Sequence, residues 1–481
     1  MKIRETISRQ VIDPETRKRW ISIAYMALTC AMLLHHVYVT MYFATVESGA
    51  IPFRFLWIFL AGATFFLGRM WKDPCSWLLT VLLLMKFLRI AIPMPEEIRE
   101  IQTIYELCVY AFFLCYGAGR ALNAKDRKTL VKAFCGLWTA AMTVYACIGL
   151  YTVWTGTVVH NLGTKSFYIH ASEERLWPIY HPVEAGTLTA VSIGVALAGF
   201  FLTERKALRV LYIPAGILIF LTGAFCVSRT GYVLTAAGIS AALCVVLVER
   251  VWKKPRKGFG FTLLRLAAAC AVFAALTLGL ILIQQKMVPA YTALRSRGGL
   301  ISTAAAEAVD AGTELGNRAF VTDEGADGFL TGRLTIWIHV CSGMDHYPIY
   351  LLIGQGVLNP MEHINGFIRY GNGMGTIYHL HSTFIQTLWE SGIPGFLVFT
   401  AFFGFFAWNA LRLITDRSAP LWQRMIPIPA MLCWLADLVD CTGYCNFGKP
   451  PMTILYFFTG LTIAIARERR KKKKQTGAEK A

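Results

Sequence analysis

Long apolar segments separated by polar ones recur along the chain from Trp20 to Ala466. A helix needs about 20 predominantly apolar residues to cross about 30 Å of hydrocarbon. The pattern therefore predicts an all-α polytopic membrane protein with about twelve transmembrane helices. The expected spans are residues 20–45, 51–69, 74–93, 100–121, 130–154, 183–203, 208–227, 230–249, 261–286, 379–411, 425–443 and 451–467, of which the tenth is long enough to include an extra turn or a tilt.

Two polar segments between the spans are too long to be simple connections, at about 155–182 and 287–378. In the second, apolar residues recur with helical spacing over Thr331–Ser342 and predict a short amphipathic helix. This long loop divides the chain into four expected parts, namely helices 1–9 at 1–286, the loop at 287–378, helices 10–12 at 379–467 and a basic tail at 468–481.

The charged residues indicate how these helices are oriented. The chain is 56% hydrophobic and only 16% charged, against roughly 25% charged residues in soluble domains. Its net charge of +18 comes from lysine and arginine at alternate helix ends, which is the positive-inside pattern of a membrane protein and argues against nucleic-acid binding. Both basic termini are therefore expected in the cytoplasm, with the two long segments on the outer face of the inner (plasma) membrane.

Histidines gather on the predicted outer side. Two of the 10 histidines fall in the first span, and the remaining eight lie in or beside the two long outer segments. Most single histidines are ordinary surface or core residues. His379 and His381 differ because they stand where the long loop meets the tenth span.

Two arginines are expected on the same side. Arg229 lies between two apolar segments with almost no loop, so it sits at or just inside the outer membrane surface, and Arg333 begins the predicted amphipathic helix. Each has an ordinary interpretation, as an interfacial anchor or as a solvated loop residue. Together with a histidine they favour binding of a lipid-linked phosphate or diphosphate, since guanidinium groups match phosphate geometry. The histidine could accept a proton from an attacking hydroxyl or hydrogen-bond the diphosphate.

A second cationic pair lies within the third span. Lys86 and Arg89 share one helix face, where they could pair with Asp437 or Asp440 or provide a further phosphate contact. Nucleotide-binding motifs and His-Glu-x-x-His are absent from the sequence, as are paired aspartates in an outer loop. The sequence thus predicts no cofactor and no metal.

These residues, in this order, resemble the O-antigen ligase and polymerase superfamily of bacterial membrane glycosyltransferases. His381-Ser382, nine residues and Gly392-Ile393-Pro394-Gly395 fit the ligase histidine signature, although His-Asn is its usual beginning. Ser228-Arg229-Thr230-Gly231 matches an arginine turn after the seventh span, Gly332-Arg333 matches a loop arginine, and Gly354-Gln355-Gly356 matches a Gly-x-Gly. Many members carry an asparagine before the sixth span, where this chain has Tyr180-His181-Pro182.

The resemblance implies a GT-C-like, metal-independent, inverting transferase that moves a glycan from an undecaprenyl-diphosphate carrier to an acceptor hydroxyl. Arg229 and Arg333 would hold the diphosphate, and His381 would activate the acceptor or orient the leaving group. His181, His379 and Ser382 are further candidates for the acceptor side or the loop.

Other functions remain open from the sequence. A polymerase that joins one lipid-linked glycan to another fits the same site, and so does transfer to a capsule or wall polymer if the envelope lacks an outer membrane. A transporter of lipid-linked glycans or solutes would require charges spread through mid-membrane positions and two similar halves, and neither is evident. A non-catalytic scaffold is the remaining alternative.

Overall fold

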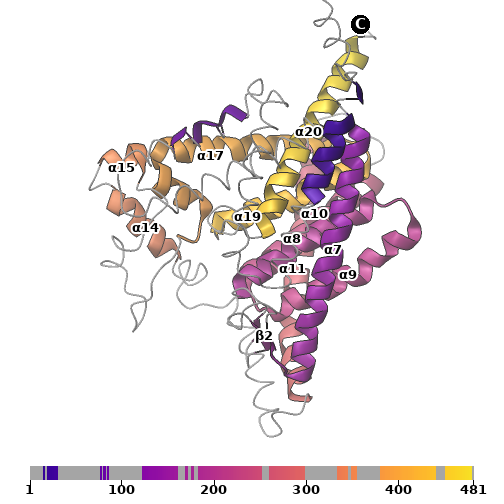
Figure 1. The fold of residues 1–481 in the computed structure, drawn as a ribbon, viewed down its shortest axis with the longest axis vertical. Coiled ribbons are helices and arrows are strands. Elements are labelled where there is room, and N and C mark those ends of the chain that lie inside the picture. The colour runs from indigo at the N-terminus through magenta and orange to yellow at the C-terminus, as the bar shows by residue number, and fades with distance from the viewer. Residues whose placement is uncertain are drawn as a thin grey trace, which may run out of the picture.

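The structure is a computed structural model, and it describes residues 15–16, 19–30, 76–78, 80–82, 84–85, 122–160, 168–171, 175–177, 182–251, 259–297, 333–344, 348–354, 380–439 and 450–478. Figure 1 shows the helices of this part of the chain arranged around a central bundle. The helices are α7 (Ala124–Thr155), α8 (Pro182–Leu202), α9 (Lys206–Phe225), α10 (Arg229–Val251), α11 (Phe259–Arg297), α14 (Arg333–Met344), α15 (Pro348–Ile353), α17 (Thr383–Thr415), α18 (Leu421–Met425), α19 (Pro427–Val439) and α20 (Pro450–Ala478).

Six of these helices are long and apolar enough to cross a membrane. They are Ala124–Thr155, Glu184–Leu202, Lys206–Phe225, Arg229–Leu247, Ala267–Leu294 and Thr383–Thr415. They coincide with the fifth to tenth expected spans, which confirms a multi-pass helical membrane protein. Helix α11 ends at Arg297 rather than near 286. The expected total of twelve stays a prediction, because the first four spans lie largely outside the described residues.

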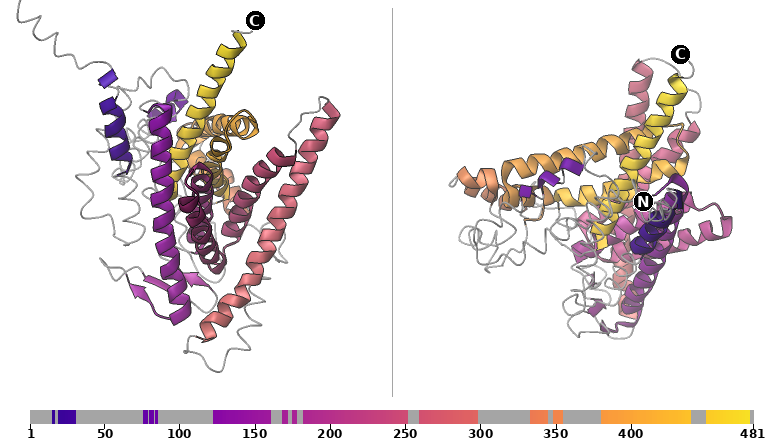
Figure 2. Two further views of the ribbon diagram at one scale, coloured as in Figure 1. Left: turned by 90° about the vertical axis from the view of Figure 1, so that its right-hand side faces the viewer. Right: turned by 45° about the horizontal axis from the view of Figure 1, so that its top comes forward.

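Helix α8 is the centre of the bundle. It packs against α7, α9, α10 and α19, and 83% of its span is buried, against 6% for α11, which lies at one edge of the bundle in Figure 2. Small residues make this packing close. A Cβ on Gly231 of α10 would lie 2.8 Å from the Cα of Gly186 in α8, so the two backbones touch. Close approach through glycine is a common basis of helix association in membranes, where burial of apolar surface provides little drive.

Aromatic packing joins α17, α19 and α20. Trp434 of α19 has the rings of five phenylalanines of α17 within 6.4 Å of its own: Phe384, Phe399, Phe402, Phe403 and Phe406. Its indole Nε1 donates a hydrogen bond to Thr459 Oγ1 of α20 at 3.2 Å. The buried indole therefore satisfies its one donor, as buried tryptophans usually do.

Helix α17 consists of two helical segments. Gly392 has φ 66° and ψ −172°, which interrupts the helix after Ser391. The part after the break, 393–415, is about 35 Å long at 1.5 Å per residue, enough to cross the bilayer by itself. The extra turn anticipated for the tenth span is thus a separate short helix, 383–391.

The segment after α7 contains a small antiparallel sheet, which the all-α prediction did not include. Its strands are β1 (Val159–His160), β2 (Tyr168–Ala171) and β3 (Leu176–Trp177). Val159 pairs with Ile169, and His170 pairs with Trp177. Ile169 and Leu176 are buried against Val153, Phe225 and Tyr291, so the sheet covers the ends of α7, α9 and α11.

Ion pairs connect several basic helix ends at the end of the bundle opposite the small sheet. Arg127 at the start of α7 contacts Glu468 of α20 at 2.9 Å, and Lys128 contacts Glu204 between α8 and α9 at 2.6 Å. Arg469 of α20 contacts Asp416 after α17 at 2.8 Å. These helix ends, which the charge pattern assigned to one side of the membrane, lie together in the structure.

We predict that Arg127→Ala destabilises the protein far more than Lys128→Ala. Arg127 is 4% exposed and also donates to Leu122 O at 2.9 Å, whereas Lys128 and Glu204 are both exposed. Loss of a part-buried charge-assisted pair together with the buried carbonyl contact should cost about 2 kcal/mol, and loss of the exposed pair less than about 0.5 kcal/mol. Thermal unfolding in detergent measures both, and equal effects would contradict the prediction.

Candidate functional site

The indole of Trp337 joins helix α14 to the start of α17. Arg333 is the first residue of α14 and is 9% exposed. One turn later, Trp337 Nε1 donates a hydrogen bond to the backbone oxygen of Leu380 at 2.8 Å. Ile336 of the same helix is buried with Leu380 and Trp389. The helix that begins with Arg333 is therefore fixed beside the residue that precedes His381.

The amide of Leu380 is held as firmly as its carbonyl. Leu380 N–H donates to Gln386 Oε1 at 3.1 Å, and Gln386 Nε2 donates to Glu390 Oε1 at 2.9 Å. Gln386 and Glu390 are 4% and 3% exposed, so water competes little for these bonds. The bond to Glu390 orients the Gln386 amide so that its oxygen faces Leu380. Hydrogen bonds from α14 and to α17 thus fix both sides of one peptide segment.

His381 follows this segment in an uncommon backbone conformation. Its φ is 51°, in the left-handed region that a non-glycine residue seldom adopts. The next residue, Ser382, is 2% exposed and caps α17, because its Oγ accepts a hydrogen bond from Ile385 N–H at 3.5 Å. His381, itself half-buried, lies between two anchored residues. Such constrained conformations are concentrated at binding and catalytic sites.

Two glycines allow α15 to pack directly on the break in α17. A Cβ on Gly354, which has φ 76°, would collide with the backbone of Glu390 and Ser391. A Cβ on Gly392 would lie 2.6 Å from Leu351 O and 2.8 Å from Leu352 C. The first glycine of Gly-Gln-Gly and the first glycine of the histidine signature are therefore parts of one backbone contact that supports the His381 turn.

A tight turn places Arg229 at the N-terminus of α10. Val227 has φ 46°, and Ser228 Oγ accepts a hydrogen bond from Gly231 N–H at 3.1 Å. Tyr232 Oη donates to Ala224 O at 2.6 Å, which ties the first turn of α10 back to the end of α9. Gly231 is the residue that contacts Gly186 of α8. Ser228 and Gly231 of Ser-Arg-Thr-Gly therefore build this turn, and Arg229 is half-buried beside them.

The sequence-predicted residues occupy two units. Arg333, His381 and Ser382 belong to the α14–α15–α17 unit, and Arg229 belongs to the α8–α10 unit. Helix α19 packs against both α10 and α17 and so connects them. Lys86, Arg89, His181 and His379 lie outside the described residues, as do Gly332, Gln355 and Gly356.

The structure also gives positioning contacts to residues for which the sequence predicted no such role. Trp337, Gln386 and Glu390 position the His381 turn, yet each has the spacing of an ordinary amphipathic helix. Arg175, just before β3, lies close enough to Cys226 at the end of α9 for its charge to act on that thiol. Arg175 is thus a further cation on the side of Arg229. The aromatic and β-branched residues around Tyr168 were the available sequence signal for the sheet that carries it.

We predict that Gly392→Ala lowers stability, whereas Gly404→Ala in the same helix does not. The methyl group at 392 would meet the backbone of α15 at a positive φ, which should cost about 2–4 kcal/mol. Gly404 has open space around its Cβ position, so alanine there should be neutral or stabilising by up to about 1 kcal/mol. Thermal unfolding in detergent distinguishes them, and an unchanged midpoint for Gly392→Ala would exclude the backbone contact.

Comparison with known proteins identifies a family that is similar to part of the chain. Residues 211–400 match the family model described as O-antigen ligase. No curated protein matches the chain. The matched segment begins in α9 and includes the Arg229 turn, Arg333, the α15 contact and His381. It also contains two of the six candidate spans in full and parts of two others. This match confirms the predicted resemblance: over residues 211–400, the chain is similar to the O-antigen ligase family of the O-antigen ligase and polymerase superfamily.

Proposed function

We propose that this protein transfers a glycan from an undecaprenyl-diphosphate carrier to an acceptor hydroxyl at the outer face of the inner (plasma) membrane. The observation that carries the proposal is the hydrogen bond from Trp337 to Leu380 O, because it holds Arg333 and His381 in one unit. Both residues lie inside the segment that matches the family model. Arg229 lies in the same segment, on the neighbouring helical unit.

The proposed reaction is a single displacement at the anomeric carbon of the donor sugar. The acceptor oxygen forms a bond to this carbon as the bond to the diphosphate oxygen breaks, and the configuration inverts. The hydroxyl proton passes to His381, and the bonding electron pair leaves with the diphosphate. Guanidinium groups at positions 229 and 333 stabilise the negative charge that develops there. This scheme requires no metal ion.

Burial supports these roles. Arg333 is 9% exposed, and attraction between a guanidinium and a diphosphate is stronger where water is partly excluded. The anchored backbone at His381 fixes the direction of its Cα–Cβ bond relative to α14 before the substrate binds, and such preorganisation removes a cost from the chemical step. A polymerase using a second lipid-linked glycan as acceptor would need the same displacement, so the acceptor that reacts distinguishes the two activities.

The test is glycan transfer by purified protein in detergent with EDTA present. Undecaprenyl-diphosphate glycan is supplied with lipid A-core or with a second lipid-linked glycan as acceptor. We expect Arg229→Ala, Arg333→Ala and His381→Ala each to reduce transfer by about 100-fold or more. Arg205→Ala, an exposed arginine at the other end of the bundle, should transfer as wild type does. Folded variants at 229, 333 and 381 that retain full activity would refute the proposed site.

Trp337→Phe tests the positioning of His381 separately. The substitution preserves most of the ring but removes the bond to Leu380 O, and loss of about one hydrogen bond should lower kcat by about tenfold. The KM for the donor should change little, because Arg333 is retained. Trp389→Phe is the matched control, since Trp389 is buried in the same cluster and its Nε1 has no hydrogen-bond partner within the described part of the chain. A similar fall in kcat for both variants would indicate a packing effect alone.

A further inference from the structure

A pocket of about 820 Å³ lies at the far end of α17 from His381. Residues from the end of α17, from the turn that follows it and from the last turns of α20 line it. The second segment of α17, residues 393–415, separates this pocket from the break at Gly392 by about 35 Å at 1.5 Å per residue. Its lining residues are Arg412, Leu413, Thr415, Asp416, Arg417, Ser418, Ala466, Arg469, Arg470 and Lys473.

The charge of this lining is strongly unbalanced. Five of its ten residues are arginine or lysine and one is aspartate. Asp416 is 10% exposed and binds two of the cations, Arg469 Nε at 2.8 Å and Lys473 Nζ at 2.9 Å. Ser418 Oγ also donates to Asp416 at 2.6 Å. Burial alone would raise the pKa of Asp416, but these hydrogen bonds outweigh it and hold the pKa well below its usual range. The carboxylate therefore serves as a fixed charge that fastens α20 to the end of α17.

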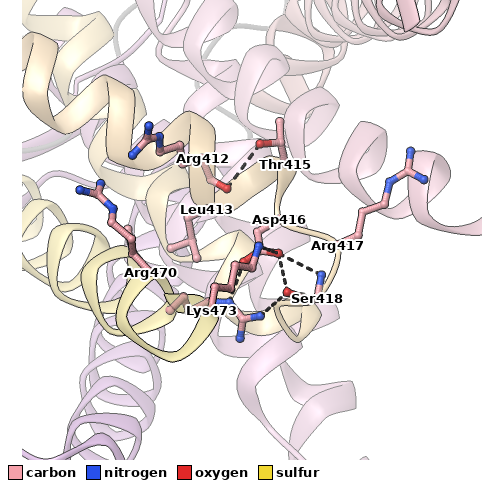
Figure 3. Close-up of a pocket in the computed structure, with 10 residues that line it drawn as sticks. Arg412, Leu413, Thr415, Asp416, Arg417, Ser418, Arg470 and Lys473 are labelled. Atoms are coloured by element: carbon pink, nitrogen blue, oxygen red, sulfur yellow. Dashed lines mark hydrogen bonds and ion pairs between the residues drawn. The ribbon is translucent and has the colours of Figure 1, made fainter. Parts of the chain in front are cut away.

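Two further guanidinium groups at the pocket are not neutralised in this way. Within the described residues, neither Arg412 nor Arg470 forms an ion pair with a carboxylate, and both are exposed. Figure 3 shows their side chains on the same side of the pocket, one from α17 and one from α20, whereas Arg417 points away. Arg412 stacks on Trp408 at 4.3 Å from the ring centroid, which limits its freedom. The pocket thus presents two guanidinium groups, from two helices, toward one space.

The surface beside these groups is apolar and belongs to the membrane-spanning part of α17. Trp408 is 51% exposed and Leu411 is 55% exposed, directly before Arg412. An exposed tryptophan next to arginines is typical of the level of the lipid headgroups. If an anion with an attached apolar chain binds Arg412 and Arg470 there, the chain lies along the apolar surface of α17. A phospholipid with an anionic headgroup has this combination, whereas a soluble phosphate uses only the charged half of the site.

We propose that Arg412 and Arg470 form a binding site for a phosphate group, supplied by an anionic phospholipid at the membrane surface where α17 and α20 meet. Asp416 holds the two helices so that both guanidinium groups reach the same phosphate. The site is separate from the proposed transfer centre. It differs from general attraction of the basic tail to the membrane because it depends on two particular residues. A bound lipid would further fix the end of α20 to α17.

The experiment measures lipid retention by native mass spectrometry of the purified full-length protein. Phosphatidylglycerol, phosphatidylcholine and inorganic phosphate are titrated separately. The test variant is Arg412→Gln/Arg470→Gln. The control is Lys471→Gln/Lys474→Gln, which removes two charges from exposed positions of α20 that do not line the pocket. We expect the test variant to bind phosphatidylglycerol about tenfold more weakly than wild type, and the control to lose about twofold or less.

The lipid and phosphate titrations distinguish the possible sources of the phosphate. Preferential binding of phosphatidylglycerol that is lost in the test variant supports the lipid site. Binding of inorganic phosphate with the same dependence on Arg412 and Arg470, without a lipid preference, supports the phosphate site but assigns it to a soluble ligand. Equal losses in the two double variants would overturn the proposal, because diffuse charge would explain them. Undiminished binding by the folded test variant, or no binding of any phosphate compound by wild type, would overturn it as well.

Discussion

A chain that crosses hydrocarbon must satisfy its own backbone hydrogen bonds, because no water is present to do so. Helices α7 to α11 meet this requirement by remaining helical through their apolar lengths. Helix α17 departs from it at Gly392, and the departure is covered by protein, since α15 lies against the interrupted backbone through Gly354 and Gly392. The candidate site lies beside this interruption of the membrane helix. Its position is reasonable because non-helical backbone at membrane depth is tolerated only where protein covers it.

In the candidate site, hydrogen bonds fix the backbone before His381, and the two arginines come from different helical units. The Leu380 segment is held on one side by Trp337 and on the other by Gln386, so His381 needs little ordering when a substrate arrives. Arg333 comes with the same unit, whereas Arg229 comes from a turn anchored on α8. In the proposed reaction, these two cations come from separately built units that α19 connects, and they would contact different oxygens of one diphosphate. A small shift between the two units would then change the positive charge around the diphosphate without moving His381.

The sequence predicted well what depends on local pattern. Apolar runs located the described spans, and the glycine and arginine motifs identified the His381 and Arg229 turns before their geometry was known. The contacts that give these motifs meaning were not predictable, because they join distant segments: Trp337 reaches a residue 43 positions away, and Gly354 meets residues 390 and 391. The small sheet was missed since its strands are two to four residues long. The pocket at Arg412 requires two helix ends to meet, which helical spacing does not reveal.

The hydroxyl groups of α8 affect how this helix enters the membrane during synthesis. Thr189 donates to Gly186 O at 2.8 Å and Ser192 donates to Leu188 O at 2.7 Å, so these polar side chains are satisfied within their own helix. During synthesis α8 enters the bilayer before α10 and α19 exist to cover it. A helix whose hydroxyls needed those later partners would expose unmet polar groups to lipid in the interval. Helix α8 can instead remain in the bilayer without these partners, and its glycine contact with α10 forms once α10 has been inserted.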